Sequence, residues 1–597
     1  MAETTTKEAK QPPAAPKGSQ LLAKKSIDKL IAEAEEPEHR LKKTLGPWSL
    51  TALGIGAIIG SGIFVLTGTA AAGENFTVPS ILHAQVMDLL IGLIRHGNTA
   101  GVLMHGRPPA GPAIALSFIL VAIACSFAGL CYAELASMIP IAGSAYTYSY
   151  ATLGEIFAWI IGWDLILEYA VSNVAVAVGF SGYLKAQLAS FGVHLSDKWS
   201  TPIFAGGQLT GAYFNVPAFL VVMILTMLLV RGVRESAETN NIMVVVKLGA
   251  IITFLVVGGM LVNKNNWHPF MPSGFGGVVT GGAIIFFTYI GFDSVSTAAE
   301  EAREPQKDIP FGIIASLIVC TILYVGVALV LLGMMPFPLF RSGTQVVQVN
   351  LAQPAGSAFE QQLKNVPKVA AVAPGSETTY RIVVDGGRDE AEAAAKEITQ
   401  LAAQNGATVQ SSSVSNAAEA PVAYALATLG TNKIFQAIII IGALTGMLSS
   451  LLVFQYGQTR IWFAMSRDGL LPAIFSAVHK RFKTPHWSTW IAGFAVGLPA
   501  GVVDIGDAAD LSNIGTLFAF VLVSLGVIML RRTQPDRPRG FKVPLVPFFP
   551  LISVVLCGGL MTGLTVITWI RFFVWLALGL VIYFLYSRRH SEFAAKS

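Results

Sequence analysis

Gly54-Ile-Gly56-Ala-Ile-Ile-Gly60-Ser61-Gly62-Ile-Phe64 is the stretch that decides the fold, because it places four glycines within nine residues of a long apolar segment. Glycine lets the backbone leave a helix, but each unpaired backbone N–H or C=O costs several kcal/mol in hydrocarbon. Irregular backbone therefore persists in a membrane only where it faces a protein cavity or a bound polar ligand. The stretch predicts a broken membrane helix with a small-molecule site near the middle of the bilayer.

Two other interpretations of the same glycines need weighing. Gly56 and Gly60 form a GxxxG motif, which lets two membrane helices approach closely. Glycines at i and i+2 are also typical of a dinucleotide-binding loop, but that loop follows a β-strand, and the flanks of this segment are membrane-like. Close packing and a transport site remain the two explanations of this stretch taken alone.

The composition is that of a polytopic membrane protein. The chain has 597 residues, of which 53% are hydrophobic and 13% are charged, and its mean hydropathy is +0.61. Roughly 25% charged residues is usual for a soluble domain. The net charge of +5 is small and unevenly spread, so it argues for orientation in a membrane and against nucleic acid as a partner. All four cysteines lie in apolar runs, so we expect packing residues and neither a disulfide framework, a metal site nor a cofactor.

Membrane spans need about 20 apolar residues, and on that scale the chain has twelve. Lys and Arg gather in the loops that a cytoplasmic N-terminus would place inside, for example at Arg231, Arg303 and Arg531. The segments 1–44 and 591–597 are therefore predicted to be cytoplasmic tails. The predicted spans are 47–73, 112–138, 154–185, 215–231, 239–262, 278–298, 310–334, 433–464, 487–504, 509–530, 546–565 and 568–587.

Two of the predicted outer loops are unusually long. The first, at 74–111, carries apolar residues from Ile81 to Leu93 with the spacing of one helix face, which predicts a short helix on the outer surface. The second, at 337–418, has strand-like and helical patterns in the order β-α-β-β-α-β. That order predicts a small ferredoxin-like α/β domain between spans 7 and 8, and a disordered insertion is the alternative.

A second break is predicted in span 6, where the sequence runs from Gly281-Gly282 through aromatic residues to Gly291 and Asp293. Broken helices at positions 1 and 6 of a five-plus-five inverted repeat are the best sequence pointer to the site of a secondary transporter. The two breaks together favour the transport site over close packing alone.

Four motifs in order resemble the bacterial cationic amino acid transporter branch of the amino acid/polyamine/organocation superfamily. The resemblance covers about 40 to 590 and implies a LeuT-like fold, alternating access and amino acid uptake across a bacterial inner (plasma) membrane. The implied parts are spans 1–7 at 45–336, the outer insertion at 337–418, and an outer gating helix with spans 8–12 at 419–590. The motifs are Gly54 to Thr69, Gly162 to Tyr169, Asn240 to Lys247, and Thr297 to Pro310.

Within this frame, physical chemistry assigns roles at the first break. An amino acid carboxylate needs hydrogen-bond donors, and the N–H groups of Ser61 and Gly62 begin the second half-helix, where the helix dipole also attracts an anion. The ammonium needs acceptors, and the unpaired carbonyls of Ile58, Phe287 and Ile290 match the family positions.

The aromatic residues of span 6 have two interpretations. Phe286, Phe287 or Phe292 would close over a bound ligand as a gate, since aromatic rings supply large apolar contacts. Ordinary packing is the alternative for each of them, because apolar aromatic residues are common in spans.

Ionisable residues inside spans are functional candidates. The resemblance implies that Lys247 occupies the position that sodium fills in sodium-coupled relatives, near Asp293, and that the pair couples transport to protons. The alternative is a lysine that reaches the cytoplasmic surface. Asp164 and Glu168 share one face of span 3, and Glu168 contacts either a cationic substrate side chain or a facing span.

The favoured prediction is a proton-coupled symporter that imports L-amino acids. The alternatives are an amino acid exchanger and a nutrient receptor that signals through its outer domain. An enzyme is not expected, because no nucleophile–base pair, metal cluster or phosphate loop stands out. The expected partners are the amino acid, protons and the lipid bilayer, for a monomer with room for a small accessory membrane subunit.

Overall fold

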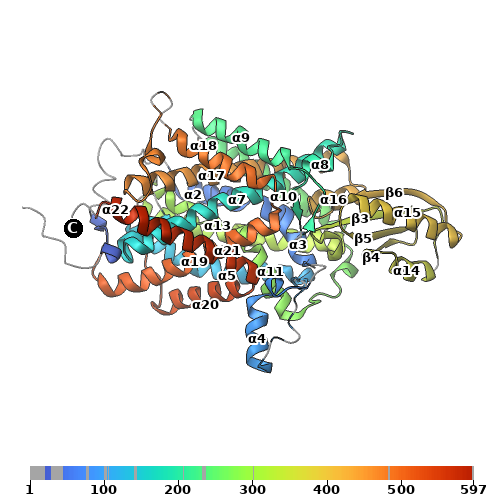
Figure 1. The fold of residues 1–597 in the computed structure, drawn as a ribbon, viewed down its shortest axis with the longest axis horizontal. Coiled ribbons are helices and arrows are strands. Elements are labelled where there is room, and N and C mark those ends of the chain that lie inside the picture. The colour runs from blue at the N-terminus through green and yellow to red at the C-terminus, as the bar shows by residue number, and fades with distance from the viewer. Residues whose placement is uncertain are drawn as a thin grey trace, which may run out of the picture.

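The computed structural model consists of a long helical bundle with a small α/β unit at one end (Figure 1). It describes residues 20–28, 45–74, 79–97, 99, 102, 104, 106–139, 144–205, 208–231, 237–299, 302–355, 357–479, 481 and 484–593.

Helices occupy all twelve segments that the sequence assigns to spans. Span 1 is divided into α2 (Pro47–Ile58), a π-helical turn (Gly62–Leu66) and α3 (Thr67–Ala72), and span 6 into α11 (Gly274–Ile285), a 3-10 turn (Phe286–Tyr289) and α12 (Ser294–Thr297). The others are α5 (Ile114–Met138), α7 (Glu155–Ser190), α9 (Val216–Arg231), α10 (Ala237–Gly259), α13 (Pro305–Met334), α17 (Lys433–Arg467), α18 (His486–Ala500), α19 (Ile505–Thr533), α20 (Phe548–Thr562) and α21 (Val566–Ile582).

Length and composition place these helices in different groups, and the 15-residue α18 belongs to neither of the two described next. Among the described residues, eight helices are long and apolar enough to cross a membrane, or nine if the bent pair of α2 and Gly62–Ala72 is one span. The apolar helices α9 and α20 are shorter than this limit. The remaining helices are α4 (Val86–His96), α6 (Ser144–Thr152), α8 (Asp197–Ser200), α14 (Ser357–Leu363), α15 (Arg388–Gln404), α16 (Pro421–Thr428) and α22 (Arg588–His590).

Small residues lie where the helices cross. α5 packs on α13, and α7 packs on both α17 and α19. Gly442 of α17 lies directly against Ala250 of α10, and Gly493 of α18 against Thr226 of α9. Membrane helices gain little from the hydrophobic effect between themselves, so close backbone approach of this kind supplies their packing energy.

Both predicted helix breaks are present. The two halves of span 1 meet at an angle of 47°, and Ile59 has the extended dihedral angles φ −81° and ψ 93°. In span 6 the backbone turns at Gly291, whose φ of +115° is one that side chains with a Cβ rarely adopt.

The loop that leaves span 1 contains the predicted surface helix, α4. The neck of this loop is closed by two backbone hydrogen bonds between Glu74 and Arg107, of 3.0 and 3.1 Å. The Arg107 guanidinium donates to Glu74 at 2.8 Å and to both carboxylate oxygens of Asp510 on α19, at 2.8 and 2.6 Å. This triad joins the far end of span 1 to span 10.

The α/β unit follows α13 and carries a four-stranded antiparallel sheet. Its elements follow one another as strand, helix, strand, strand, helix and strand, and the strand order in space is β4-β5-β3-β6. One face forms its own core with α14 and α15, which includes Val347, Phe359 and Ile382. On the other face Val346 and Val383 belong to the core of the bundle. The strands are β3 (Thr344–Leu351), β4 (Val369–Ser376), β5 (Thr379–Asp385) and β6 (Val409–Ser415).

A row of ion pairs fastens the α/β unit to the bundle. Arg388 of α15 pairs with Asp197 of α8 at 3.0 Å, Asp197 with Lys185 of α7 at 2.8 Å, and Lys185 with Glu419 before α16 at 2.9 Å. Burial alone would raise the pKa of Asp197, but Lys185 and Arg388 hold it below its usual value. The unit is therefore attached to span 3 and to the segment that leads into α16.

Part of the predicted N-terminal tail packs on the bundle. Lys25 donates to Asp468 at 2.7 Å, and Ile27 is buried in the bundle core. Most of the tail at 1–44, and residues 594–597 of the C-terminal tail, lie outside the described residues.

Candidate functional site

The two helix breaks face each other in the middle of the bundle. A Cβ placed on Gly62 would lie 2.6 Å from Cγ2 of Thr288, and one on Gly291 would lie 3.0 Å from the backbone carbon of Ala57. Glycine is therefore required at both points for close approach. Close packing and a broken-helix site, which are alternatives in the sequence, occur together here.

Tyr324 of α13 joins the two breaks. Its hydroxyl lies 3.0 Å from the Ile58 carbonyl of span 1 and 2.8 Å from the Thr288 carbonyl of span 6. A hydroxyl has one hydrogen to donate, so the two carbonyls share a single donor. The Ile58 carbonyl also accepts from the Gly60 N–H at 3.1 Å, so this predicted ammonium ligand already has two donors from the protein. Tyr324 is not among the site residues predicted from the sequence. Its signal is a tyrosine in an apolar span, since buried tyrosine hydroxyls usually have a partner.

Lys247 of α10 contacts the same break from the other side. Its Nζ donates to the carbonyls of Gly56 at 2.6 Å and Ile59 at 2.9 Å, and its side chain is fully buried. The alternative of a lysine that reaches the cytoplasmic surface is therefore wrong. The expected proximity to Asp293 is not borne out by these contacts, because the unpaired carbonyls of span 1 hold the ammonium.

Asp293 belongs to a separate group of buried acids. It interacts electrostatically with Glu168, which also interacts with Asp164 and is hydrogen bonded to Thr516. Neither carboxylate oxygen of Asp164 has a hydrogen-bond partner among the described residues. Glu168 lies eight residues before Val176, the α7 residue beside Gly60, which is about 12 Å along the helix. The structure therefore groups Glu168 with Asp293, which follows the turn of the second break at Gly291.

The start of the second half of span 1 has an unpaired polar group. Ser61 precedes the turn Gly62–Leu66, and its hydroxyl is fully buried without a hydrogen-bond partner among the described residues. A buried hydroxyl without a partner is costly. A ligand carboxylate at this helix start would accept hydrogen bonds from that hydroxyl and from the first N–H groups of the helix.

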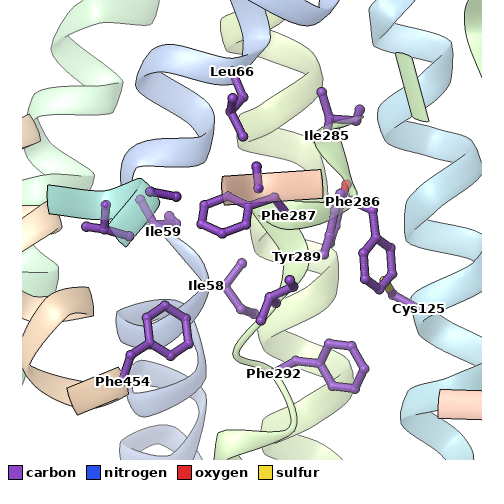
Figure 2. Packing of buried hydrophobic residues seen from close by; sticks show 14 of the residues in the cluster. Ile58, Ile59, Leu66, Cys125, Ile285, Phe286, Phe287, Tyr289, Phe292 and Phe454 are labelled. Carbon is purple, nitrogen blue, oxygen red and sulfur yellow. The ribbon is translucent and has the colours of Figure 1, made fainter. Parts of the chain in front are cut away.

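The three phenylalanines of span 6 point in different directions (Figure 2). Phe287 lies beside the break of span 1, near Ile59, whereas Phe286 points toward Cys125 on α5. Phe286 and Phe292 both pack on Phe520 of α19, with ring centroids 5.8 and 5.0 Å apart. The expected gate residues Phe286 and Phe292 are therefore packing partners of span 10 here, and Phe287 is the ring placed at the site.

The site is closed to solvent in this structure. Ile58, Phe287 and Ile290 are each at most 5% exposed, and Gly62 is buried. Among the residues that the structure describes, no three His, Cys, Asp or Glu side chains are grouped so that they would hold a metal ion. The two breaks therefore form a closed, mostly apolar site that contains the Ser61 hydroxyl and several backbone carbonyls.

We expect Gly62→Ala to reduce both stability and ligand binding, because the added Cβ would meet Thr288 at 2.6 Å, and overpacking of this kind costs about 1–3 kcal/mol. Adding Thr288→Ser removes the contacting Cγ2 and should restore part of the thermal stability, because Cα and Cβ of residue 288 still lie 3.0 Å from the added Cβ. Binding should stay weak, since the methyl group of the introduced alanine still stands where the carboxylate approaches. Melting temperatures with and without substrate measure both effects. If the double variant also recovers full binding, Gly62 is a packing residue only.

The sequence matches known transport proteins along its whole length. The profile of the amino acid permease family matches residues 45–373, and a profile of the permease C-terminus matches residues 541–591. The chain is 42% identical to the branched-chain amino acid permease BcaP of Bacillus subtilis (strain 168), over 96% of this chain and 99% of that protein. It is 38% identical to the methylthioribose transporter of the same organism, over 96% and 99%. It is 31% identical to the vacuolar cationic amino acid transporter 4 of Arabidopsis thaliana, over 86% of this chain and 68% of that protein.

Proposed function

The chain belongs to the amino acid permease family, and we propose that it imports branched-chain L-amino acids by proton-coupled symport with alternating access. It is a multi-pass membrane transporter and not an enzyme, because its full-length relatives are permeases and transporters. The observation that carries the choice of substrate is the full-length similarity to the branched-chain amino acid permease. We infer a bacterial plasma membrane as its location from the two bacterial relatives that it matches along nearly its full length.

The chemistry of the site supports an aliphatic amino acid. Ser61 and Gly62 supply donors for the carboxylate. The Ile290 carbonyl accepts from the ammonium together with a share of the Phe287 carbonyl, which also accepts from the Ile290 N–H at 3.3 Å. The side chain then lies against the Phe287 ring and the aliphatic residues around it.

Lys247 supports proton coupling. A buried ammonium held by two carbonyls and no carboxylate is stable only while those carbonyls surround it. When span 1 moves, the carbonyls of Gly56 and Ile59 separate from Nζ, and the proton is released to whichever side is open. Because the ammonium already occupies the carbonyl oxygens of Gly56 and Ile59, this mechanism needs no sodium ion at the break.

The helix arrangement supports a LeuT-like five-plus-five repeat with twelve spans and both termini in the cytoplasm. Helices at all twelve predicted segments, with breaks in the first and sixth, are what that repeat requires. The strand order β4-β5-β3-β6 supports a ferredoxin-like insertion on the outer side. α16, which leads from the insertion into span 8, is then the outer gating helix.

A specific observation favours a second candidate function, the transport of methylthioribose. The methylthioribose transporter of Bacillus subtilis is nearly as similar as the branched-chain amino acid permease and is covered to the same extent. Methylthioribose has no carboxylate, so it would leave the donors of Ser61 and Gly62 without an anionic partner. That difference favours the amino acid.

Uptake by the purified protein in proteoliposomes tests the proposal. We expect leucine, isoleucine and valine to accumulate under an inward proton gradient, with no response to sodium, and methylthioribose and arginine to compete weakly. Accumulation that requires preloaded amino acid and ignores the pH gradient would identify an exchanger. Strong sodium stimulation would contradict the coupling mechanism, and binding without any uptake would support the receptor alternative.

A further inference from the structure

Helix α4 projects from the side of the bundle, across the direction of the spans (Figure 1). Its sequence, VMDLLIGLIRH, has only three residues with ionisable side chains. Leu90, Ile91 and Leu93 are exposed, and Ile94 is 82% exposed. Contact of such side chains with water forgoes about 1.5–3 kcal/mol for each one that could be fully buried, so this surface requires an apolar environment.

The base of α4 fixes its depth relative to the spans. Val86 donates to the carbonyl of Leu564 at 3.2 Å, and Val566 donates to the carbonyl of Ala84 at 2.9 Å. Leu564 lies in the turn between α20 and α21, so α4 begins at the ends of two spans.

Two further contacts place this base at the edge of the apolar zone. Thr280 donates to Gln85 at 2.7 Å, and it lies six residues after the start of α11 at Gly274, which is about 9 Å along that helix. The Trp569 indole donates to Met561 at 3.0 Å across the same turn, and tryptophan is enriched at the level of the lipid headgroups.

We propose that α4 is an interfacial anchor that lies in the boundary between headgroups and acyl chains of one leaflet. The span α21, which begins beside the base of α4, also exposes apolar side chains such as Val574 and Leu578, and lipid covers these in a membrane. An amphipathic helix of this kind buries its apolar side chains about 5–10 Å into the boundary. Arg95, next to Ile94 at the tip, is exposed and reaches lipid phosphates. On the proposed topology the leaflet is the outer one.

The anchor has a consequence for the loop that carries it. α4 lies between Glu74 and Arg107, which close the neck of the loop and join it to Asp510. Holding α4 at a fixed depth therefore holds the far end of span 1 relative to the membrane.

A spin label on Ile94→Cys in proteoliposomes of the full-length chain tests the proposal. All four native cysteines are buried, so the introduced thiol is the one that reacts. Two controls bracket the result: Val574→Cys, on an exposed apolar face of α21, and Gln410→Cys, on the exposed strand β6. We expect the label at position 94 to collide readily with oxygen and to be shielded from a water-soluble nickel chelate, as at position 574.

Two outcomes would overturn the proposal. Access of the nickel chelate equal to that at position 410 would place α4 in water. Shielding from both reagents would mean that protein covers the helix, either a second copy of the chain or a small membrane subunit. The measurement does not depend on which side of the membrane α4 occupies. A negative result would therefore overturn the anchor without bearing on the proposed transport function.

Discussion

Lys247→Ala should abolish concentrative uptake of amino acids, because it removes the ammonium that joins α10 to the broken end of α2. Nζ donates at 2.6 and 2.9 Å to the carbonyls of Gly56 and Ile59, and among the described residues no other ionisable side chain donates to either carbonyl. The variant should remain folded, since carbonyls without a strong donor cost only about 1–3 kcal/mol. Proteoliposome uptake under a pH gradient, with the melting temperature measured in parallel, gives both quantities.

Two further variants separate charge from volume. Lys247→Met keeps most of the side-chain volume without the charge, and should lose proton-driven uptake as completely as the alanine variant. Lys264→Ala removes an exposed lysine near the same helix and should transport normally. Proton-driven accumulation by the methionine variant would show that Lys247 fills space and that the proton travels elsewhere.

The breaks in spans 1 and 6 were predictable because their cause is local. A run of glycines in hydrocarbon, or Gly291 beside an acid, is visible without knowledge of neighbours, and the structure confirms both. The α/β unit was predictable for the same reason, since periods of two and of about 3.6 residues distinguish strands from helices. The attachment of this unit to the bundle through Val346 and Val383 was not predictable. Alternating apolar and polar residues identify a strand but do not say which part of the protein covers each face of the sheet.

The contacts between spans could not be predicted from periodicity. The partners of Lys247 depend on how α10 crosses α2, so its hydrogen bonds to Gly56 and Ile59 could not be predicted from the sequence. Tyr324 carries no signal beyond its polar hydroxyl in an apolar helix. The directions of Phe286 and Phe292 depend on Phe520, which lies more than two hundred residues away in the chain. A single sequence without aligned relatives fixes none of these distances.

Arg107→Met should produce the largest loss of stability among the predicted variants. The guanidinium is 4% exposed and pairs with Asp510, which is 3% exposed, and with Glu74. Removing one partner of a buried ion pair leaves the other charge uncompensated, which costs about 3–5 kcal/mol. The matched control is Arg571→Met, because Arg571 pairs with Asp507 nearby but is 41% exposed, and exposed pairs contribute about 0–1 kcal/mol. Melting temperatures of the two variants measure the difference.

The pH dependence of the Arg107→Met variant identifies the cause of that loss. Burial raises the pKa of Glu74, and Arg107 opposes the increase, so removing the arginine raises that pKa further. A carboxyl whose pKa is higher in the folded than in the unfolded protein stabilises the fold at pH values below its unfolded-state pKa, which is about 4. That contribution is lost as the pH rises through the folded-state pKa. The variant should therefore lie closest to the wild type at acid pH and fall behind it toward neutral pH.

A second substitution tests whether the triad closes the outer side. Arg107→Met combined with Asp510→Asn removes both charges of the shorter pair and should recover much of the lost stability, because the one member of the triad left charged, Glu74, is 15% exposed. It should not recover transport, since the link between the end of span 1 and α19 is still absent and the outer side cannot close over bound substrate. Recovery of concentrative uptake in the double variant would show that the triad stabilises the fold without taking part in the transport cycle.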